Sequence, residues 1–218
     1  MQTLYHQSFC PFSRKIRIVL GEKGLPFDMC EEEGFLQLNL AGETPVLLVD
    51  GGHELSGSVA IAEYLEEIAP QPRLMGGETA VERAEIRRLV GWFDHKFHDE
   101  VGRTLVAEKI TKRLRDHRNA PNSALIRSGY QALRRHIHYV DSLAEQGNWL
   151  AGPRFSMADV AAAAHLSCVD YIGDIPWESA PAAKEWYARV KSRPSVRPLL
   201  ADCVPFVPPS KQYADLDF

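Results

Sequence analysis

The stretch PVLLVDGGHEL (45–55) predicts a β-hairpin, and this hairpin sets the fold class of the first part of the chain. Gly51 and Gly52 can take the positive φ angles that a tight hairpin turn requires, and an apolar run leads into them. The next segment, SVAIAEYLEEIA (58–69), predicts an amphipathic helix. Its expected apolar face carries Val59, Ala62, Leu65 and Ile68.

Upstream of the hairpin, strand and helix signals alternate. QTLYH (2–6) and PFDMC (26–30) predict short strands. Between them, the segment 13–23 predicts a helix that Gly24 ends. The order of elements over residues 1–70 is therefore βαβ followed by ββα, which indicates an α/β domain.

The predicted secondary structure changes after residue 70. The Pro- and Gly-rich stretch 71–77 predicts an interdomain linker, and residues 78–204 predict an all-helical domain. Ser156 and Asp159 form a capping box at the start of one of its helices. The segment 205–218 is left as an extended C-terminal tail. The expected helices cover 78–117, 123–146, 155–173, 180–192 and 193–203, the last with Pro194 near its first turn.

Composition excludes several classes of function. The 218 residues carry a net charge of -4, with 25 basic against 29 acidic residues, which argues against a nucleic-acid partner. The four cysteines have no metal-binding or CxxC spacing, so reduced thiols are expected. No leader pattern and no apolar run of about 18 residues occur, so a cytoplasmic protein without a membrane span is expected.

Several motifs, taken in order, resemble the cytosolic glutathione transferase superfamily. They are FCPFSRKIRIVL (9–20), LNLAGETPVLLVDGG (38–52), LSGSVAIAEYLEE (55–67), NWLAGPRFSMADVAAAAHL (148–166) and RPSVRPLL (193–200). The resemblance implies a thioredoxin-like N-terminal domain followed by an all-helical domain. It also implies a homodimer.

Cys10, in CPFSRK (10–15), is the first candidate site residue. A thiol at the start of a helix lies where free amides and the helix dipole favour an anion, so thiolate chemistry is available there. The resemblance implies that a cysteine here bonds the sulfur of glutathione. In serine-using members a hydroxyl activates the thiol instead, which makes Ser8 and Ser13 alternatives. The alternative to all of these is that Cys10 has no chemical role and is only a small packed residue.

The remaining glutathione-binding positions implied by the resemblance are Thr44, Pro45, Val46, Gly57 and Ser58. A cis Thr44–Pro45 bond turns the Thr44 backbone toward glutathione, or merely shapes the domain. Family members carry an acidic or amide residue before the serine, where this chain has Gly57. A lost charge-assisted hydrogen bond is worth about 1.5–3 kcal/mol, so glutathione binding is expected to be weakened and no cofactor to be required.

Two charged segments outside this site are candidates for other ligands. His95 and His98 share one helix at a spacing that suits a metal, but no third ligand is fixed and no metal site is expected. The run 103–118 is strongly basic, which suits either a solvated helix face or a docking face for an acidic partner. The docking face would consist of Lys109, Lys112, Arg113, Arg115 and Arg118.

The tail KQYADLDF (211–218) is either a structural strap or a motif held out for a partner. The pattern favours a short motif that orders on binding, because acids flank apolar anchors. The sequence also resembles the transferase-like division proteins of the superfamily, which bind the tubulin homologue FtsZ. This implies a non-catalytic division factor at the division site, with FtsZ filaments and other division proteins as the expected partners. The alternative is a glutathione-dependent transferase or thiol transferase that uses Cys10. The tail residues expected to bind a partner are Tyr213, Asp215, Leu216, Asp217 and Phe218.

Overall fold

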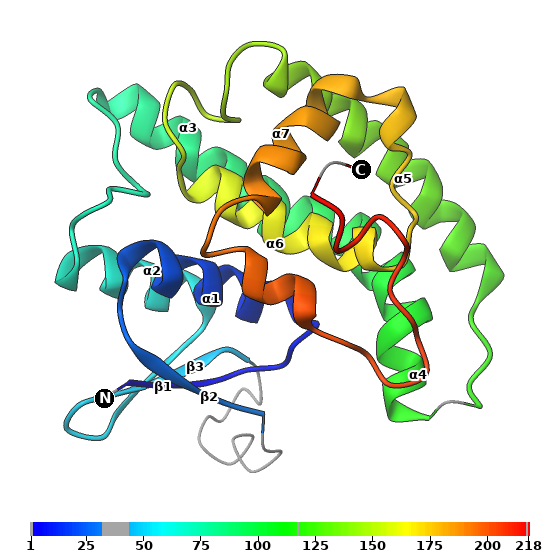
Figure 1. Cartoon of the computed structure of the whole chain (residues 1–218), viewed down its shortest axis with the longest axis horizontal. Coiled ribbons are helices and arrows are strands. Elements are labelled where there is room, and N and C mark those ends of the chain that lie inside the picture. Colours follow the sequence, from blue (N-terminus) through cyan, green and yellow to red (C-terminus); the bar gives the residue numbers. More distant parts are fainter. Residues whose placement is uncertain (1, 32–43, 117, 217) are drawn as a thin grey trace.

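The computed structural model describes residues 2–31, 44–116, 118–216 and 218, and it places an α/β domain beside a larger helical domain (Figure 1). Residues 38–43 of the motif 38–52, His117 at the end of the predicted helix 78–117, and Asp217 lie outside the described residues. The expected fold class, a thioredoxin-like domain followed by an all-helical domain, is confirmed.

The N-terminal domain contains a four-stranded mixed sheet of order β2-β1-β3-β4. Its strands are β1 (Gln2–Tyr5), β2 (Phe27–Cys30), β3 (Val46–Val49) and β4 (His53–Ser56). Strand β1 runs parallel to β2 and antiparallel to β3, which pairs antiparallel with β4. The predicted hairpin is confirmed, because Val49 faces His53 and the turn glycines, Gly51 and Gly52, have φ angles of 86° and 77°.

Helices α1 (Pro11–Lys23) and α2 (Ser58–Ile68) accompany the sheet, and α1 ends at Gly24 in the left-handed conformation as predicted. The predicted apolar face of α2 is only half right. Ala62 and Leu65 are buried, whereas Val59 and Ile68 are 57% and 46% exposed. A spacing of three residues drifts by about 60° per step around a helix of 3.6 residues per turn, so four such residues do not share one face.

The connection between the domains is packed. Leu74 and Met75 are buried, and their amides donate to the Glu66 carboxylate at 3.3 and 3.1 Å. The Met157 amide in turn donates to the Leu74 carbonyl at 2.8 Å. The stretch 71–77 is therefore an ordered crossing that is fixed to both domains.

The helical domain begins with one long run made of α3 (Ala80–Gly91), the π-type segment η2 (Trp92–Thr111) and α4 (Lys112–Arg115). It continues with α5 (Ser123–Ala144), α6 (Met157–Tyr171), η3 (Trp177–Ser179), α7 (Pro181–Lys191) and η4 (Arg197–Ala201). The helix predicted over 193–203 is thus reduced to the short 3-10 turn η4. Pro194 and Pro198 explain this, because proline lacks an amide donor and disfavours helical geometry in the residue before it.

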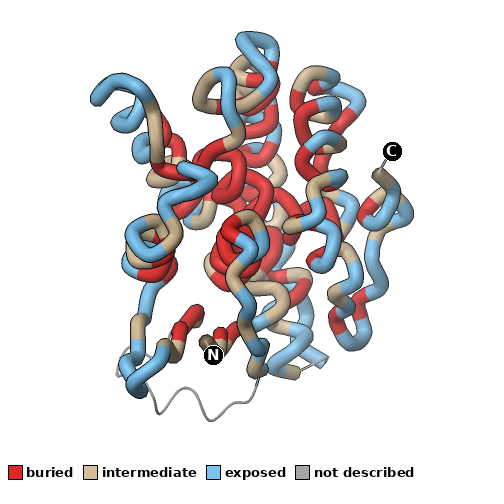
Figure 2. The backbone as a smooth tube through the Cα atoms, turned by 60° about the vertical axis from the view of Figure 1, so that its left-hand side comes forward, coloured by how far each residue is buried: buried red, intermediate tan, exposed pale blue. Residues whose placement is uncertain are grey.

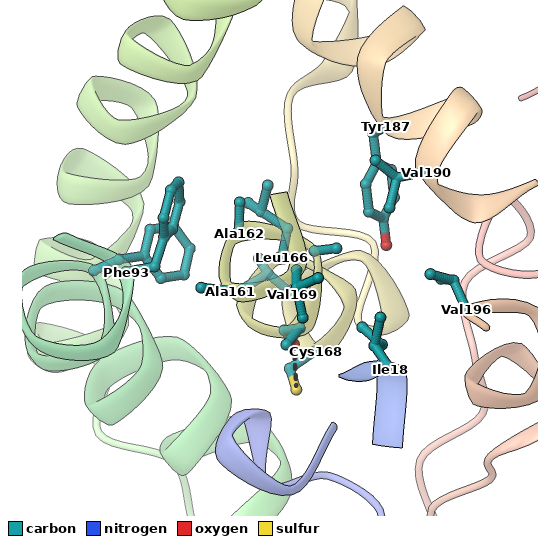
Figure 3. Close-up of a cluster of buried hydrophobic side chains, with 14 of the residues drawn as sticks. Ile18, Phe93, Ala161, Ala162, Leu166, Cys168, Val169, Tyr187, Val190 and Val196 are labelled. Carbon is teal, nitrogen blue, oxygen red and sulfur yellow. Dashed lines mark hydrogen bonds between the residues drawn. The ribbon is translucent and has the colours of Figure 1, made fainter. Parts of the chain in front are cut away.

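Helix α6 is the centre of the core and is buried along its whole length. Side chains from α1, η2 and α7, among them Ile18, Phe93 and Val190, surround it (Figure 3). Buried segments concentrate on the inner sides of the helices around it (Figure 2). The predicted capping box at its start is confirmed, since the Ser156 amide donates to the Asp159 carboxylate at 3.0 Å. In the described part of the chain, every helix is too short or too polar to cross a bilayer.

Candidate functional site

Cys10 occupies the cap position that begins α1. Its carbonyl accepts the first helical hydrogen bond from the Arg14 amide at 2.9 Å. The half-buried thiol lies 3.8 Å from the Thr44 carbonyl oxygen, toward which it can donate. The Thr44–Pro45 bond is cis, which confirms the expectation. The fold therefore brings Cys10 and Thr44 together across 34 positions of sequence.

Gly57 and Ser58 lie at the same corner, because the Gly57 amide donates to the Pro45 carbonyl at 3.2 Å. Val46 belongs to this corner as well, through its pairing with Ser56 across β3 and β4. Gly57 has a φ angle of 85°, and no described atom lies within 4 Å of the point where a Cβ would stand. As the cap of α2, Gly57 supplies no side-chain hydrogen bond. Position 57 thus has open space around it and carries no polar side chain, and the weakened glutathione site stays a prediction.

The two serine alternatives to Cys10 have different environments. The Ser8 hydroxyl donates to the carboxylate of Glu31, so it lies on the open side of the loop. Ser13 is completely buried, and its hydroxyl oxygen accepts from the Gln7 amide at 3.3 Å. This hydroxyl holds the loop from inside, and the expectation that Ser13 activates a substrate thiol stays a prediction.

Two charged residues that sequence reasoning missed fix α1 against the helical domain. Arg14 and Lys15 are 0% and 1% exposed, although basic residues in a first helical turn ordinarily face solvent. Lys15 pairs with Asp94, which also lies 3.3 Å from His165 Nε2. Burial alone would raise the pKa of Asp94, but the hydrogen bond with His165 and the charge of Lys15 outweigh it and hold that pKa below its usual range.

Arg14 holds the loop that carries Cys10. Its Nε donates to the Ser8 carbonyl and one terminal nitrogen donates to Ser167 Oγ, both at 2.7 Å. The other terminal nitrogen lies 3.2 Å from the Asp202 carboxylate, and the guanidinium stands over the Phe9 ring at 4.2 Å. These contacts position the start of α1 relative to both α6 and the segment after η4.

The histidine pair on η2 is split by the fold. His95 is exposed, whereas the His98 ring packs 4.9 Å from Phe12 and 5.6 Å from His165. Burial, together with the positive charges of His165 and Arg103, lowers the pKa of His98 to about 4. Among the described residues, no group of three or more His, Cys, Asp or Glu side chains is placed to hold a metal ion.

The basic run divides into paired and exposed residues. Lys109 Nζ donates to both oxygens of Asp174 at 2.6 and 2.8 Å and to the Tyr130 hydroxyl at 2.7 Å, so Lys109 ties η2 to the end of α6. Its expected role in partner binding stays a prediction, although this charge is already paired within the fold. Lys112 pairs with Glu108 at 2.6 Å while remaining 39% exposed.

The exposed part of the basic run lies at its C-terminal end. Arg113, Leu114 and Arg115 are exposed, and Leu114 is 49% exposed. Arg118 is also exposed and makes a 3.1 Å ion pair with Asp116. A basic face of Lys112, Arg113, Arg115 and Arg118 thus remains for contact with an acidic surface.

The tail folds back on the helical domain, which corrects the expectation of a motif held out for a partner. Tyr213 is completely buried, donates to the Leu199 carbonyl at 2.7 Å and lies edge-on to Tyr171 with ring centroids 4.9 Å apart. The Ser210 amide donates to the Tyr171 carbonyl at 2.7 Å. The short apolar segment is stable because it completes a core that already exists.

Phe218 anchors the end of the tail to the helical domain. Its ring lies 5.4 Å from that of Trp177 and 6.0 Å from that of Tyr187, and the buried Lys191 ammonium stands 4.0 Å above it. Lys191 also donates to the Gln212 carbonyl at 2.7 Å. Of the tail residues expected to bind a partner, Asp215 is exposed, and Leu216 and Phe218 are half-buried.

Two family models match the chain. "Glutathione S-transferase, N-terminal domain" matches residues 4–73, and "Glutathione S-transferase, C-terminal domain" matches residues 107–189. Together they span both domains of the fold.

Similar proteins and structures cover the full length. The chain is 47% identical to FtsZ-localized protein A of Caulobacter vibrioides, over 100% of this chain and 98% of that protein. It is 27% identical to glutathione S-transferase 2 of Saccharomyces cerevisiae, over 90% and 88%. A glutathione S-transferase from Rhodospirillum rubrum F11 superposes with a TM-score of 0.94 at 47% identity and full coverage of both chains. FzlA from C. crescentus superposes with a TM-score of 0.93 at 45% identity, over 100% and 99%.

Proposed function

This chain belongs to the glutathione S-transferase superfamily, and from that premise we propose that it is a non-catalytic cell-division factor that binds FtsZ filaments and regulates their architecture and constriction. The observation that carries the proposal is the 47% identity to FtsZ-localized protein A, which extends over the whole of this chain, tail included. A shared fold alone would not carry it, because transferase scaffolds host more than one function.

The glutathione corner supports a binding role over a catalytic one. Gly57 stands where a residue with a polar side chain would bind the charged end of glutathione, and its φ angle of 85° favours glycine. An absent charge-assisted bond costs about 1.5–3 kcal/mol, which is roughly one to two orders of magnitude in affinity. We therefore propose that this role does not require glutathione as a cofactor.

The basic face is the proposed contact with FtsZ. Arg113 and Arg115 are exposed at the end of the long helical run, with Lys112 and Arg118 on either side of them. A cluster of this kind on a chain of net charge -4 favours an acidic partner surface and speeds association at low salt.

A homodimer would strengthen this contact. Val59 and Ile68 on α2, and Val81 at the start of α3, are exposed apolar side chains in consecutive helices. Covering them in a symmetric pair would give two basic faces per particle, and linking two modest contacts raises the avidity for a filament. We propose that such pairs bridge or curve FtsZ filaments at the division site.

Co-pelleting with FtsZ polymer tests the proposal. Wild-type protein is expected to sediment with the polymer at moderate salt, and Arg113→Glu is expected to lose most of that binding. Arg134→Glu is the matched control, because it reverses an exposed arginine on α5 and is expected to co-pellet like wild type. Absence of wild-type protein from the pellet would contradict the proposal.

The alternative function is a glutathione-dependent transferase or thiol transferase that uses Cys10. It is favoured by the placement of the Cys10 thiol at a helix start, 3.8 Å from the Thr44 carbonyl beside a cis proline. Calorimetric titration of glutathione, together with an electrophile assay on wild type and Cys10→Ser, distinguishes the two. Tight binding with turnover that Cys10→Ser abolishes would establish the alternative.

A further inference from the structure

Arg14 contacts both the C-terminal tail and the loop 7–10 at the start of α1. Its guanidinium carbon lies 5.9 Å from the centre of the Tyr213 ring and 4.2 Å from the centre of the Phe9 ring. Its Nε also donates to the Ser8 carbonyl at 2.7 Å. Both Arg14 and Tyr213 are completely buried. One buried cation therefore has the tail on one side and the loop on the other.

Three aromatic rings join the same two segments. The Phe9 ring lies edge-on to Tyr171 with centroids 4.4 Å apart, and Tyr171 lies edge-on to Tyr213 at 4.9 Å. Tyr171 belongs to the end of α6, which the red tail crosses in Figure 1. Arg14 is fixed to this helix as well, because it donates to Ser167 Oγ at 2.7 Å. The tail and the loop therefore share their packing partners on α6.

The hydrogen bonds that hold the loop differ in strength. The Gln7 amide donates to Ser13 Oγ at 3.3 Å, which is long for a bond of this kind. The bond from Arg14 to the Ser8 carbonyl is short at 2.7 Å and charge-assisted, so it is the stronger of the two. The guanidinium keeps this geometry only while it stays packed, and Tyr213 supplies part of that packing. Removing the tail from its place would therefore weaken the stronger bond.

We infer that the tail and the loop that carries Cys10 are coupled through Arg14, so that release of the tail loosens the loop and loosening of the loop weakens tail docking. The two states are a docked tail with an ordered loop and a released tail with a loose one. Coupling between two sites is reciprocal and typically amounts to about 5- to 150-fold. A partner that draws the tail off the helical domain would thus change the Cys10 corner without touching it. The coupling holds for either function proposed above, because it needs neither a filament nor glutathione.

Hydrogen–deuterium exchange of the full chain, followed by mass spectrometry, tests the coupling from the tail side. Tyr213→Leu removes the ring but keeps a buried apolar side chain. Amides of the loop are expected to exchange at least about fivefold faster than in wild type. Phe218→Leu is the matched control, because its ring packs on Trp177 and Lys191, and it is expected to leave the loop at the wild-type rate. The hairpin turn 50–53, another turn of the same domain, is the internal reference and is expected to exchange equally in all three proteins.

The reverse direction uses a variant on the loop side. Arg14→Lys keeps the charge but loses the planar fork that holds the loop and α6 together. The tail amides of Ser210 and Tyr213 are expected to exchange faster by a factor similar to that of the first experiment. Arg17→Lys is the matched control, because Arg17 lies on the same helix and binds the same Asp202 carboxylate, at 2.8 and 3.0 Å. This direction decides the question even if Tyr213→Leu fails to fold.

Four results would overturn the inference. In the first, the loop of folded Tyr213→Leu exchanges as in wild type. In the second, the hairpin turn accelerates as much as the loop, because the tail would then only stabilise the protein as a whole. In the third, Phe218→Leu accelerates the loop as much as Tyr213→Leu does, because the effect would not pass through Arg14. In the fourth, Arg14→Lys leaves the tail at the wild-type rate, because a coupling must act in both directions.

Discussion

Removing the Tyr213 side chain is expected to destabilise the whole helical domain. The Tyr213→Ala variant deletes a completely buried ring, its contact with Tyr171 at 4.9 Å and its hydrogen bond to the Leu199 carbonyl at 2.7 Å. The conservative Tyr213→Phe variant deletes only the hydroxyl. Together the two variants separate ring burial from the hydrogen bond.

The expected magnitudes follow from these contacts. Loss of the hydroxyl leaves the buried Leu199 carbonyl without this donor, which costs about 1–2 kcal/mol. Loss of the whole buried ring costs about 3–5 kcal/mol, of which roughly 0.5–1.5 kcal/mol belongs to the aromatic pair with Tyr171. A domain stability of about 5–15 kcal/mol makes the larger loss readily measurable.

Urea unfolding, followed by tryptophan fluorescence and circular dichroism, measures the free energy of unfolding of each variant. Ala214→Ser, at the exposed neighbouring position, is the control and is expected to unfold like wild type. Deletion of residues 211–218 is expected to cost at least as much as Tyr213→Ala, because it also leaves Lys191 buried without Gln212 and Phe218. A loss below about 1 kcal/mol for Tyr213→Ala would refute the conclusion that the tail is a structural strap.

Alkaline pH gives an independent test of the same residue. Burial, set against the opposing charge of Arg14, raises the pKa of Tyr213 to about 12 from an ordinary value of 10.0. Because the folded state disfavours ionisation of Tyr213, the contribution of this residue to the free energy of unfolding is complete below pH 10. It is lost as the pH rises toward 12. This loss amounts to roughly 2–3 kcal/mol. Tyr213→Phe is expected to show a flatter stability profile between these pH values, and an unchanged profile would contradict the assignment.

Three further outcomes are expected. Lys109→Met lowers the free energy of unfolding in urea by about 2 kcal/mol, because it leaves the nearly buried Asp174 carboxylate without its cation. The double variant Lys109→Met with Asp174→Asn loses less than the sum of the two single changes. The lowered pKa of His98, about 4, means that its contribution to stability is complete above pH 6.5 and is lost as the pH falls toward 4. His98→Gln should therefore reduce the loss in the free energy of unfolding between pH 6.5 and 4 by about 1–2 kcal/mol, after allowance for solvent screening. The change His95→Gln, at an exposed position, should leave that loss unchanged. Gly57→Ala, at a φ of 85° with open space around it, should lower stability by about 1 kcal/mol through backbone strain alone, and an unchanged thermal midpoint would contradict this.

Much of the candidate site was predictable from the sequence. The motif CPFSRK indicated a cysteine at a helix start, and the structure has Cys10 at the cap of α1, in contact with Thr44 at a cis proline. What the motif could not indicate is that Arg14 and Lys15 point inward. Their burial depends on Asp94 and Asp202, which arrive from elements far along the chain.

Residue types alone were enough to predict three local features: the hairpin at Gly51 and Gly52, the helix end at Gly24 and the cap made by Ser156 and Asp159. These depend on backbone angles and on hydrogen bonds between residues a few positions apart, so the residue types suffice.

The surroundings of Lys109 and Tyr213, by contrast, follow from the packing of the helices. Lys109 forms an internal ion pair and Tyr213 is a core residue, although each lies in a segment whose composition suggests a solvated surface. Their contacts are with Asp174 and Leu199, which meet them only when the helices pack. The residue pattern within a segment does not show which distant group its side chains contact. These contacts are therefore known only once the helices are packed together.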